Sequence, residues 1–190
     1  MSGVLYIHGF NSSPQSLKAR LTQSYLTKHH PKVDFYCPQL ANTPLAAIAQ
    51  LERILSGEKI KQWTLLGSSL GGYFSTYLAE KYGLRAVLIN PAVRPFELMA
   101  DYIGEQVNPY TNEVYRVGHQ HIDELKSLEQ KKIAKKHYKV MVQTGDEVLD
   151  YQQAVEKYQG CRLVVQQGGD HSFIDYEKSL PDIAKFLRWQ

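Results

Sequence analysis

The sequence has few cysteines, no long apolar run and little net charge, and each shortage excludes a class of protein. Its two cysteines, Cys37 and Cys161, are too few for a disulfide framework and form no C-x-x-C metal or redox pair. No apolar run approaches the roughly 18 residues of a membrane helix. Met1–Phe10 lacks the basic segment and long apolar stretch of a secretory signal. We therefore expect a soluble, cytoplasmic protein without a membrane span.

The charges nearly balance, with 22 Lys and Arg against 19 Asp and Glu and a formal net charge of +3. This excess is too small to indicate a nucleic-acid partner. Hydrophobic residues make up 43% and charged residues 22%, which is typical of a globular chain and not of a disordered one. No repeat, low-complexity segment or Gly/Ser-rich linker divides the chain. We expect one domain over residues 1–190.

Short apolar runs alternate with longer segments of helical period, and this alternation indicates an α/β fold with a mainly parallel sheet. Leu70, Phe74 and Leu78 illustrate the helical spacing, and a last helix is expected to begin near Pro181. The six predicted strands are Gly3–Ile7, Val33–Tyr36, Gln62–Leu66, Arg85–Ile89, Tyr138–Gln143 and Arg162–Gln166.

The segment Gly67-Ser68-Ser69-Leu70-Gly71 matches G-x-S-x-G around Ser69. It falls where a predicted strand ends and an amphipathic helix begins, which is where a nucleophile elbow must lie. Side chains in place of Gly67 or Gly71 would clash with adjacent backbone in such a sharp turn. We interpret Ser69 as a nucleophile. The alternative is a Gly/Ser-rich turn without chemistry; a phosphate loop is disfavoured because the G-x-x-x-x-G-K-[ST] lysine is missing.

A serine is a weak nucleophile at neutral pH, so it needs a base that is oriented by a carboxylate. His171, in the Gly-rich loop Gly168–Phe173 after the last strand, is the predicted base. Asp146 follows the fifth strand at its C-terminal end and is the favoured acid. Asp150 and Glu147 lie in the same loop and remain rivals, although Asp150 also suits the N-cap of the next helix.

An acyl-transfer site also needs donors for a developing oxyanion. The N–H of Leu70 opens the helix after Ser69, and the N–H of Phe10 lies in the loop that leaves the first strand. We predict these two amides as the oxyanion hole. His8, in the same loop, is interpreted as a brace rather than as the base.

Together, the His8–Phe10 loop, the Ser69 elbow, the Asp146 loop and the His171 loop resemble the α/β-hydrolase superfamily, which shares their chain order of nucleophile, acid and base. More narrowly, the whole chain resembles the small YqiA-like esterase family. The resemblance implies a three-layer fold with helices on both faces of a shortened six-stranded sheet, in the spatial order 2-1-3-4-5-6. It also implies hydrolysis of carboxylic esters or acyl thioesters through Ser69, His171 and Asp146.

The predicted function is therefore a serine esterase that acts on a small-molecule ester or thioester through an acyl-enzyme, with no cofactor and no metal. The alternative is a catalytically silent hydrolase-fold binding module. Two other interpretations are disfavoured. His119, His121 and Asp123 do not share one helix face as metal ligands would, and Cys37 is expected to be a buried strand-end residue rather than the nucleophile.

The stretch between the fourth and fifth strands, Pro91–His137, is longer than a crossover helix requires, so we expect a small cap or lid over about residues 91–137. Apolar residues within it could wall an acyl pocket or pack as a flap: Phe96, Leu98, Met99, Tyr102, Ile103, Tyr110 and Tyr115. A run of lysines follows: Lys126, Lys131, Lys132, Lys135, Lys136 and Lys139. Such runs are usually solvated faces, but at the pocket mouth they would favour acyl groups on anionic carriers such as coenzyme A.

Overall fold

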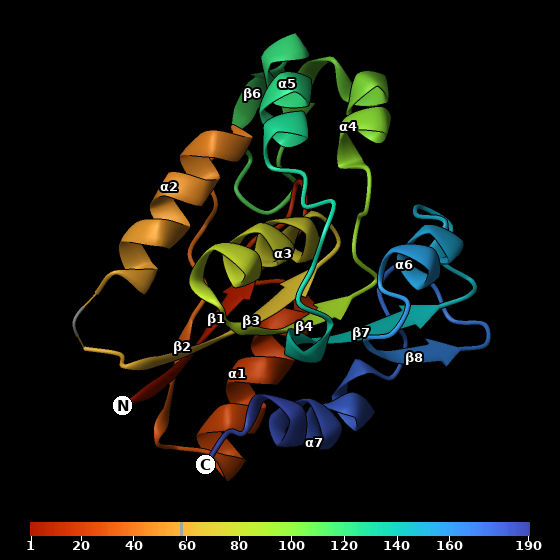
Figure 1. Ribbon diagram of the computed structural model, residues 1–190. Helices are drawn as coiled ribbons and strands as arrows, with labels where there is room; N and C mark the ends of the chain where they lie inside the picture. Colours follow the sequence, from red (N-terminus) through yellow and green to blue (C-terminus); the bar gives the residue numbers. More distant parts are fainter. Residues whose placement is uncertain (58) are drawn as a thin grey trace.

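The computed structural model describes residues 1–57 and 59–190 and contains a six-stranded parallel sheet (Figure 1). The order is β2-β1-β3-β4-β7-β8. It is the predicted order of the six main strands, and the labels differ only because β5 and β6 form a separate pair. The strand bounds are β1 Ser2–Ile7, β2 Val33–Tyr36, β3 Gln62–Ser68, β4 Arg85–Ile89, β7 Tyr138–Gln143 and β8 Arg162–Gln166. The α/β prediction is confirmed.

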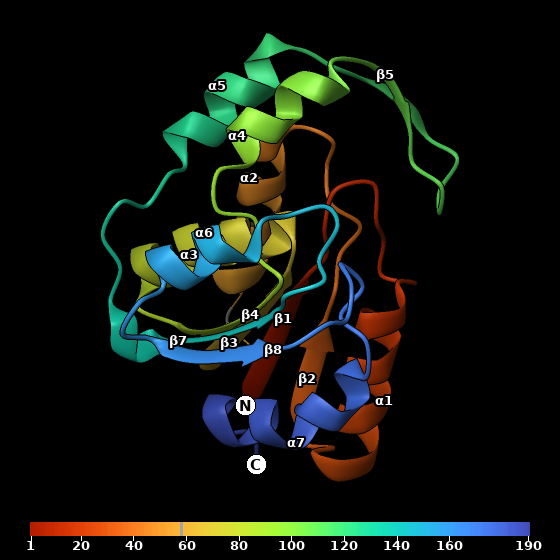
Figure 2. The same cartoon turned by 90° about the vertical axis from the view of Figure 1, so that its right-hand side faces the viewer.

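Helices cover both faces of the sheet (Figures 1 and 2). On one face lie α1 (Leu17–His29) and α7 (Tyr176–Leu187); on the other lie α2 (Pro44–Leu55), α3 (Leu70–Tyr82) and α6 (Tyr151–Lys157). The alternation along β1 explains this arrangement. Val4 and Tyr6 belong to the core beneath α1 and α7, whereas Leu5 and Ile7 belong to the opposite core. A strand that is buried on both faces reads as a continuous apolar run, as β1 does.

Most of the stretch between β4 and β7 lies beyond α2 and α3. It carries a hairpin that lies beside the loop after β1, where Asn108 donates to the Ser12 carbonyl at 3.0 Å (Figure 2). Its elements are α4 Pro95–Leu98, η1 Met99–Tyr102, β5 Gly104–Val107, β6 Val114–Val117, α5 His119–Ser127 and η2 Lys135–His137. The antiparallel β5–β6 pair was not expected from the sequence. The residues of β5 are Gly-Glu-Gln-Val, which form no apolar or β-branched run, so only the existence of a long insertion could be predicted.

Three element boundaries differ from expectation. β1 begins at Ser2, one residue before the expected Gly3. β3 continues through Ser68, because Gly67 and Ser68 pair with Leu88 and Ile89 of β4. α7 begins at Tyr176, so Pro181 lies inside the helix rather than near its start. Residues on both sides of the proline are buried on one face of α7, and this burial outweighs the loss of one helical N–H.

The two cysteines lie on opposite faces of the sheet. Cys37 packs against the core beneath α1 and α7, and Cys161 packs against the core on the other side. Both are free thiols. Within residues 1–57 and 59–190, no helix combines the length and the apolar character that crossing a membrane requires.

A buried charge joins the sheet to α7. Lys139 of β7 is fully buried and its ammonium contacts the carboxylate of Asp182, on α7. Arg162 of β8 is the cross-strand partner of Lys139 and lies 3.8 Å from the same carboxylate. The half-exposed Asp182 carboxylate thus lies within ion-pair distance of cations from two adjacent strands.

Removing this carboxylate would leave the Lys139 ammonium buried without its partner. We expect Asp182→Asn to lower the free energy of unfolding by about 1–3 kcal/mol. Lys139→Met replaces the buried charge with an apolar chain of similar shape, so we expect unchanged or increased stability. Urea denaturation measures both variants. If Asp182→Asn unfolds at the same urea concentration as the unaltered chain, the ion pair does not stabilise the fold.

Candidate functional site

Ser69 occupies the sharp turn between β3 and α3. Its backbone has φ 55° and ψ −122°, a region that a residue with a side chain rarely adopts. Backbone hydrogen bonds hold it there: its N–H donates to the Ile89 carbonyl at 3.1 Å, and its carbonyl accepts from Gly72 at 2.9 Å and Ala92 at 3.0 Å. The turn therefore has the geometry predicted for an elbow at Ser69.

Glycines make this turn sterically possible. A Cβ on Gly71 would overlap the Ile7 carbonyl at the end of β1, and a Cβ on Gly67 would overlap the Gly71 carbonyl and the Ser75 hydroxyl. The first turn of α3 consequently lies directly against the carboxyl end of β1. This close approach brings the loop after β1 beside Ser69, where a Cβ on Gly9 would lie 3.1 Å from the Ser69 Cβ.

A chain of hydrogen bonds joins the three residues predicted to act together. His171 Nε2 lies 3.1 Å from Ser69 Oγ. His171 Nδ1 lies 2.8 Å from one oxygen of Asp146 and 3.0 Å from the other. Because the carboxylate accepts the Nδ1 proton, Nε2 is left with a lone pair that faces the Ser69 hydroxyl. The structure thus brings together a hydroxyl, an imidazole and a carboxylate from three distant loops.

The Asp146 carboxylate is almost completely buried, at 2% side-chain exposure. Burial by itself raises its pKa, but the hydrogen bond from His171 and those from the N–H groups of Leu149 and Val148 outweigh it, so the net pKa lies below the ordinary value. Those amides lie 2.8 and 2.9 Å from Asp146 Oδ1. Asp146 is therefore held as a carboxylate against the imidazole.

The rival residues have other partners. Asp150 caps α6 by accepting from the Gln152 N–H at 2.9 Å. Glu147 accepts the backbone N–H of His171 at 3.0 Å and so contacts the loop, not the ring. His8 accepts the Leu40 N–H at Nε2 and donates from Nδ1 to the Gly9 carbonyl, as expected of a brace. Burial raises the pKa of Cys37 to about 12, so its thiol is protonated at neutral pH.

Phe10 and Leu70, the two predicted oxyanion donors, both line the pocket that contains Ser69 and His171. Within residues 1–57 and 59–190, no hydrogen bond occupies either backbone N–H. The Phe10 ring stacks edge-on with Tyr102 at 5.1 Å and with Tyr115 at 6.4 Å between centroids. The insertion therefore fixes the loop that carries the Phe10 amide.

The pocket beside Ser69 has a volume of about 200 Å³. Its apolar wall consists of Ala92, Pro95, Leu98, Met99, Val148 and Leu149. Leu98, Met99 and Tyr102 thus line it as expected, whereas Phe96, Ile103, Tyr110 and Tyr115 do not. None of the six lysines of the lysine-rich run is among its lining residues. Lys135 instead lies against Gly160, near the amino end of β8 and away from Ser69.

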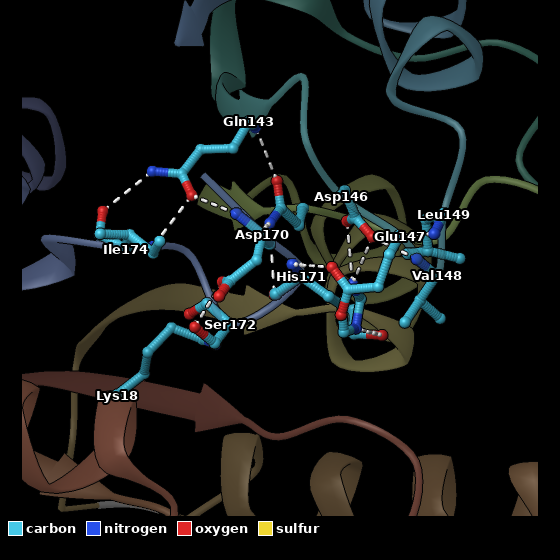
Figure 3. A network of polar contacts seen from close by, with 12 residues as sticks. Lys18, Gln143, Asp146, Glu147, Val148, Leu149, Asp170, His171, Ser172 and Ile174 are labelled. Carbon is cyan, nitrogen blue, oxygen red and sulfur yellow. Dashed lines mark hydrogen bonds and ion pairs between the residues drawn. The ribbon is translucent and has the colours of Figure 1, made fainter. Parts of the chain in front are cut away.

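Sequence reasoning missed the residues that hold the His171 loop. Gln143 ends β7, and its side chain binds the backbone on both sides of His171 (Figure 3). Asn90 follows β4 and donates to the Asp170 and His171 carbonyls at 3.0 and 3.2 Å. The sequence does contain a signal for Asn90 and Gln143, because each is a carboxamide residue that directly follows the apolar residues of a strand.

The residues considered as metal ligands do not form a metal site. Among the described residues, no group of three or more His, Cys, Asp or Glu side chains is placed to hold an ion. His121 accepts the Gly118 N–H at its Nδ1, and this bond helps begin α5.

The lowered pKa of Asp146 makes its contribution to stability depend on pH. The ionised carboxylate is bound more favourably in the folded chain, so its stabilisation is complete above the ordinary pKa of about 3.9 and is lost as pH falls through the lower folded-state value. We expect the stability difference between the unaltered chain and Asp146→Asn to shrink as pH falls from about 5 to below about 4. Urea unfolding across this range measures it, and a difference that widens in acid would contradict the assignment.

Comparisons with known proteins agree with the fold. The alpha/beta hydrolase domain-containing protein 10 from mouse is 16% identical, with a TM-score of 0.74 over 98% of this chain and 89% of that one. Est1E from Butyrivibrio proteoclasticus is 14% identical, with a TM-score of 0.73 over 98% and 87%. The esterase domain of a Rhodothermus marinus protein is 19% identical, with a TM-score of 0.66 over 99% and 85%. The fold is that of the α/β-hydrolases.

The family comparison covers almost the whole chain. Residues 3–188 match the family described as Uncharacterised protein family (UPF0227), which is the YqiA-like family that the sequence motifs resemble. The chain therefore belongs to the UPF0227 family.

Proposed function

We propose that this protein is a serine esterase that hydrolyses carboxylic esters or acyl thioesters of small molecules. The observation that carries the proposal is the continuous chain of hydrogen bonds from Asp146 through His171 to Ser69, beside an apolar pocket. A structural role alone does not call for an imidazole oriented by a buried carboxylate toward a hydroxyl on a strained turn. The described esterases among the structures of the same fold support this assignment.

In the first half of the proposed reaction, Ser69 Oγ attacks the acyl carbonyl while His171 Nε2 takes its proton. The Asp146 carboxylate stabilises the resulting imidazolium. The Leu70 and Phe10 amides donate hydrogen bonds to the oxyanion of the tetrahedral intermediate. Collapse breaks the bond to the alcohol or thiol, which leaves with the proton from His171, and the acyl group stays on Ser69.

Deacylation repeats these steps with water as the nucleophile. His171 takes a proton from water as its oxygen attacks the acyl-enzyme, and the same two amides hold the second oxyanion. The proton then passes to Ser69 Oγ as the carboxylic acid is released. Every group in this cycle belongs to the protein or the substrate, so the chemistry needs no cofactor.

The pocket favours an apolar acyl group of limited size. Its volume of about 200 Å³ and its wall of aliphatic side chains suit a short aliphatic or aromatic acyl chain. Leu98, Met99 and Tyr102 of the insertion and Val148 of the Asp146 loop flank this space. We propose that residues 91–137 act as a cap that shapes the acyl site within one domain.

The six lysines of the lysine-rich run do not line the pocket that contains Ser69. Lys126, Lys131, Lys132, Lys135 and Lys136 are exposed, and Lys139 is buried in the sheet. This placement supports a solvated face. We therefore assign these six lysines no role in selecting the leaving group, and we expect thioesters on neutral carriers to be as acceptable as those on coenzyme A.

Substitution of the three residues tests the proposal on a panel of p-nitrophenyl esters with varied acyl length. We expect Ser69→Ala and His171→Ala to lower turnover by about four to six orders of magnitude, and Asp146→Asn to lower it less. Asp150→Asn is the matched control, because it alters a helix cap in the same loop and should change turnover by less than about threefold.

A larger loss in Asp150→Asn than in Asp146→Asn would overturn the choice of acid. A correctly folded protein that hydrolyses no ester of the panel and does not react with a fluorophosphonate would instead support the silent binding module.

The position of the lysines gives a salt prediction. Raising ionic strength from about 0.05 M to about 0.5 M should reduce kcat/KM for an acyl-coenzyme A no more than kcat/KM for a neutral ester with the same acyl group. Parallel initial-rate measurements decide the point. A selective loss of thioester turnover would show that basic residues steer the anionic carrier.

A further inference from the structure

The loop that carries His171 has an unfavourable backbone. Between β8 and α7, Gly168, Gly169, Phe173 and Asp175 all have positive φ, at 74°, 74°, 64° and 61°. Two of these residues carry side chains, which makes the conformation strained. A loop of this kind keeps one shape only where surrounding groups impose it, and the imidazole of His171 depends on that shape.

Gln143 binds this loop on both sides of His171 (Figure 3). Its Oε1 accepts the N–H of Asp170 at 3.1 Å and that of Ile174 at 2.9 Å. Its Nε2 donates to the Ile174 carbonyl and to Gln166 Oε1, both at 2.9 Å. The side chain is buried, and a Cβ on Gly169 would overlap its carboxamide. The loop is therefore packed directly onto this amide.

Asn90 binds the loop from the neighbouring strand. Its Nδ2 donates to the carbonyls of Asp170 and His171, and its Oδ1 accepts the backbone N–H of Gln143 at 2.9 Å. Its own N–H continues the sheet by donating to Met141 at 2.9 Å. Asn90 is 3% exposed and has φ 39°, so it too is locked in a strained conformation.

Resting on the proposed function, we propose that Asn90 and Gln143 are positioning residues that fix His171 Nε2 at hydrogen-bond distance from Ser69 Oγ. The two amides connect the ends of β4 and β7 to the backbone of Asp170, His171 and Ile174. Carboxamides suit this task because each side chain both donates and accepts while remaining uncharged.

A small displacement of the imidazole affects the reaction strongly, since about 1 Å of misplacement can lower a rate by about 100-fold. Substrate binding is affected much less, because neither Asn90 nor Gln143 lines the acyl pocket. Loss of the hydrogen bonds from Asn90 and Gln143 to the His171 loop should therefore lower kcat and the reactivity of Ser69, with KM nearly unchanged.

The test measures the rate of fluorophosphonate labelling of Ser69 per titrated active site, so that unfolded molecules do not contribute. We expect Gln143→Met, which removes all four side-chain bonds, to slow labelling and kcat by about 10- to 100-fold and to change KM by less than about threefold. Gln143→Glu keeps the two accepting bonds and should restore part of the rate. If Gln143→Met fails to fold, labelling of Gln143→Glu provides the test.

Thr64→Val is the matched control. It removes the partly buried Thr64 hydroxyl, which accepts from Trp189 Nε1 at 3.1 Å near the amino end of β3, and should leave labelling unchanged. Labelling of Gln143→Met and Gln143→Glu at the control rate would overturn the inference while leaving the proposed function intact. An unaltered protein that neither labels nor turns over esters would refute the proposed function itself.

Discussion

The contact between Gly71 and the Ile7 carbonyl is the constraint on which the site depends. It presses the first turn of α3 against the end of β1, and no side chain fits between them. With α3 packed this closely against β1, Ser69 has a positive φ at the turn before the helix, and the loop that contains Gly9 and Phe10 lies next to Ser69. The proposed nucleophile, the two candidate oxyanion amides and one wall of the pocket thus share one steric cause.

The opposite wall of the site also results from a close contact between backbone segments. The Asp146 loop and the His171 loop approach each other so closely that a Cβ on Gly145 would overlap the Gly169 carbonyl. The Gly145 N–H donates to Gly168 at 2.9 Å and holds the two loops together. Buried hydrogen bonds then orient the carboxylate and the imidazole, and water is largely excluded from Asp146. Close packing of glycine-containing backbone sets the positions, and polar side chains set the orientations.

The sequence allowed the repeating part of the fold and the grouping of Ser69, Asp146 and His171 to be predicted. Each strand is an apolar run, and Ser69, Asp146 and His171 each follow a strand at the same edge of a parallel sheet. The hydrogen bonds from Asn90 and Gln143 to the His171 loop were not predicted, because they depend on which side chains meet once β4 and β7, which are distant in the sequence, pair in the sheet. The β5–β6 hairpin and the start of α7 were missed for other reasons. The mostly exposed hairpin offers no apolar run at β5, and at α7 the burial of residues on both sides of Pro181 outweighs the contrary signal of the proline.

The insertion joins these two walls. Its residues Leu98, Met99 and Tyr102 complete the pocket, and its Tyr115 hydroxyl donates to Asn11 at 2.5 Å in the loop next to Phe10. An acyl-enzyme on Ser69 can be detected by mixing the protein with a short-chain ester, quenching in acid within milliseconds and mapping the peptides by mass spectrometry. We expect one adduct of the acyl mass on the peptide that contains Ser69, and none in Ser69→Ala. An adduct on Cys37 or on another serine, with Ser69 unmodified during turnover, would contradict it.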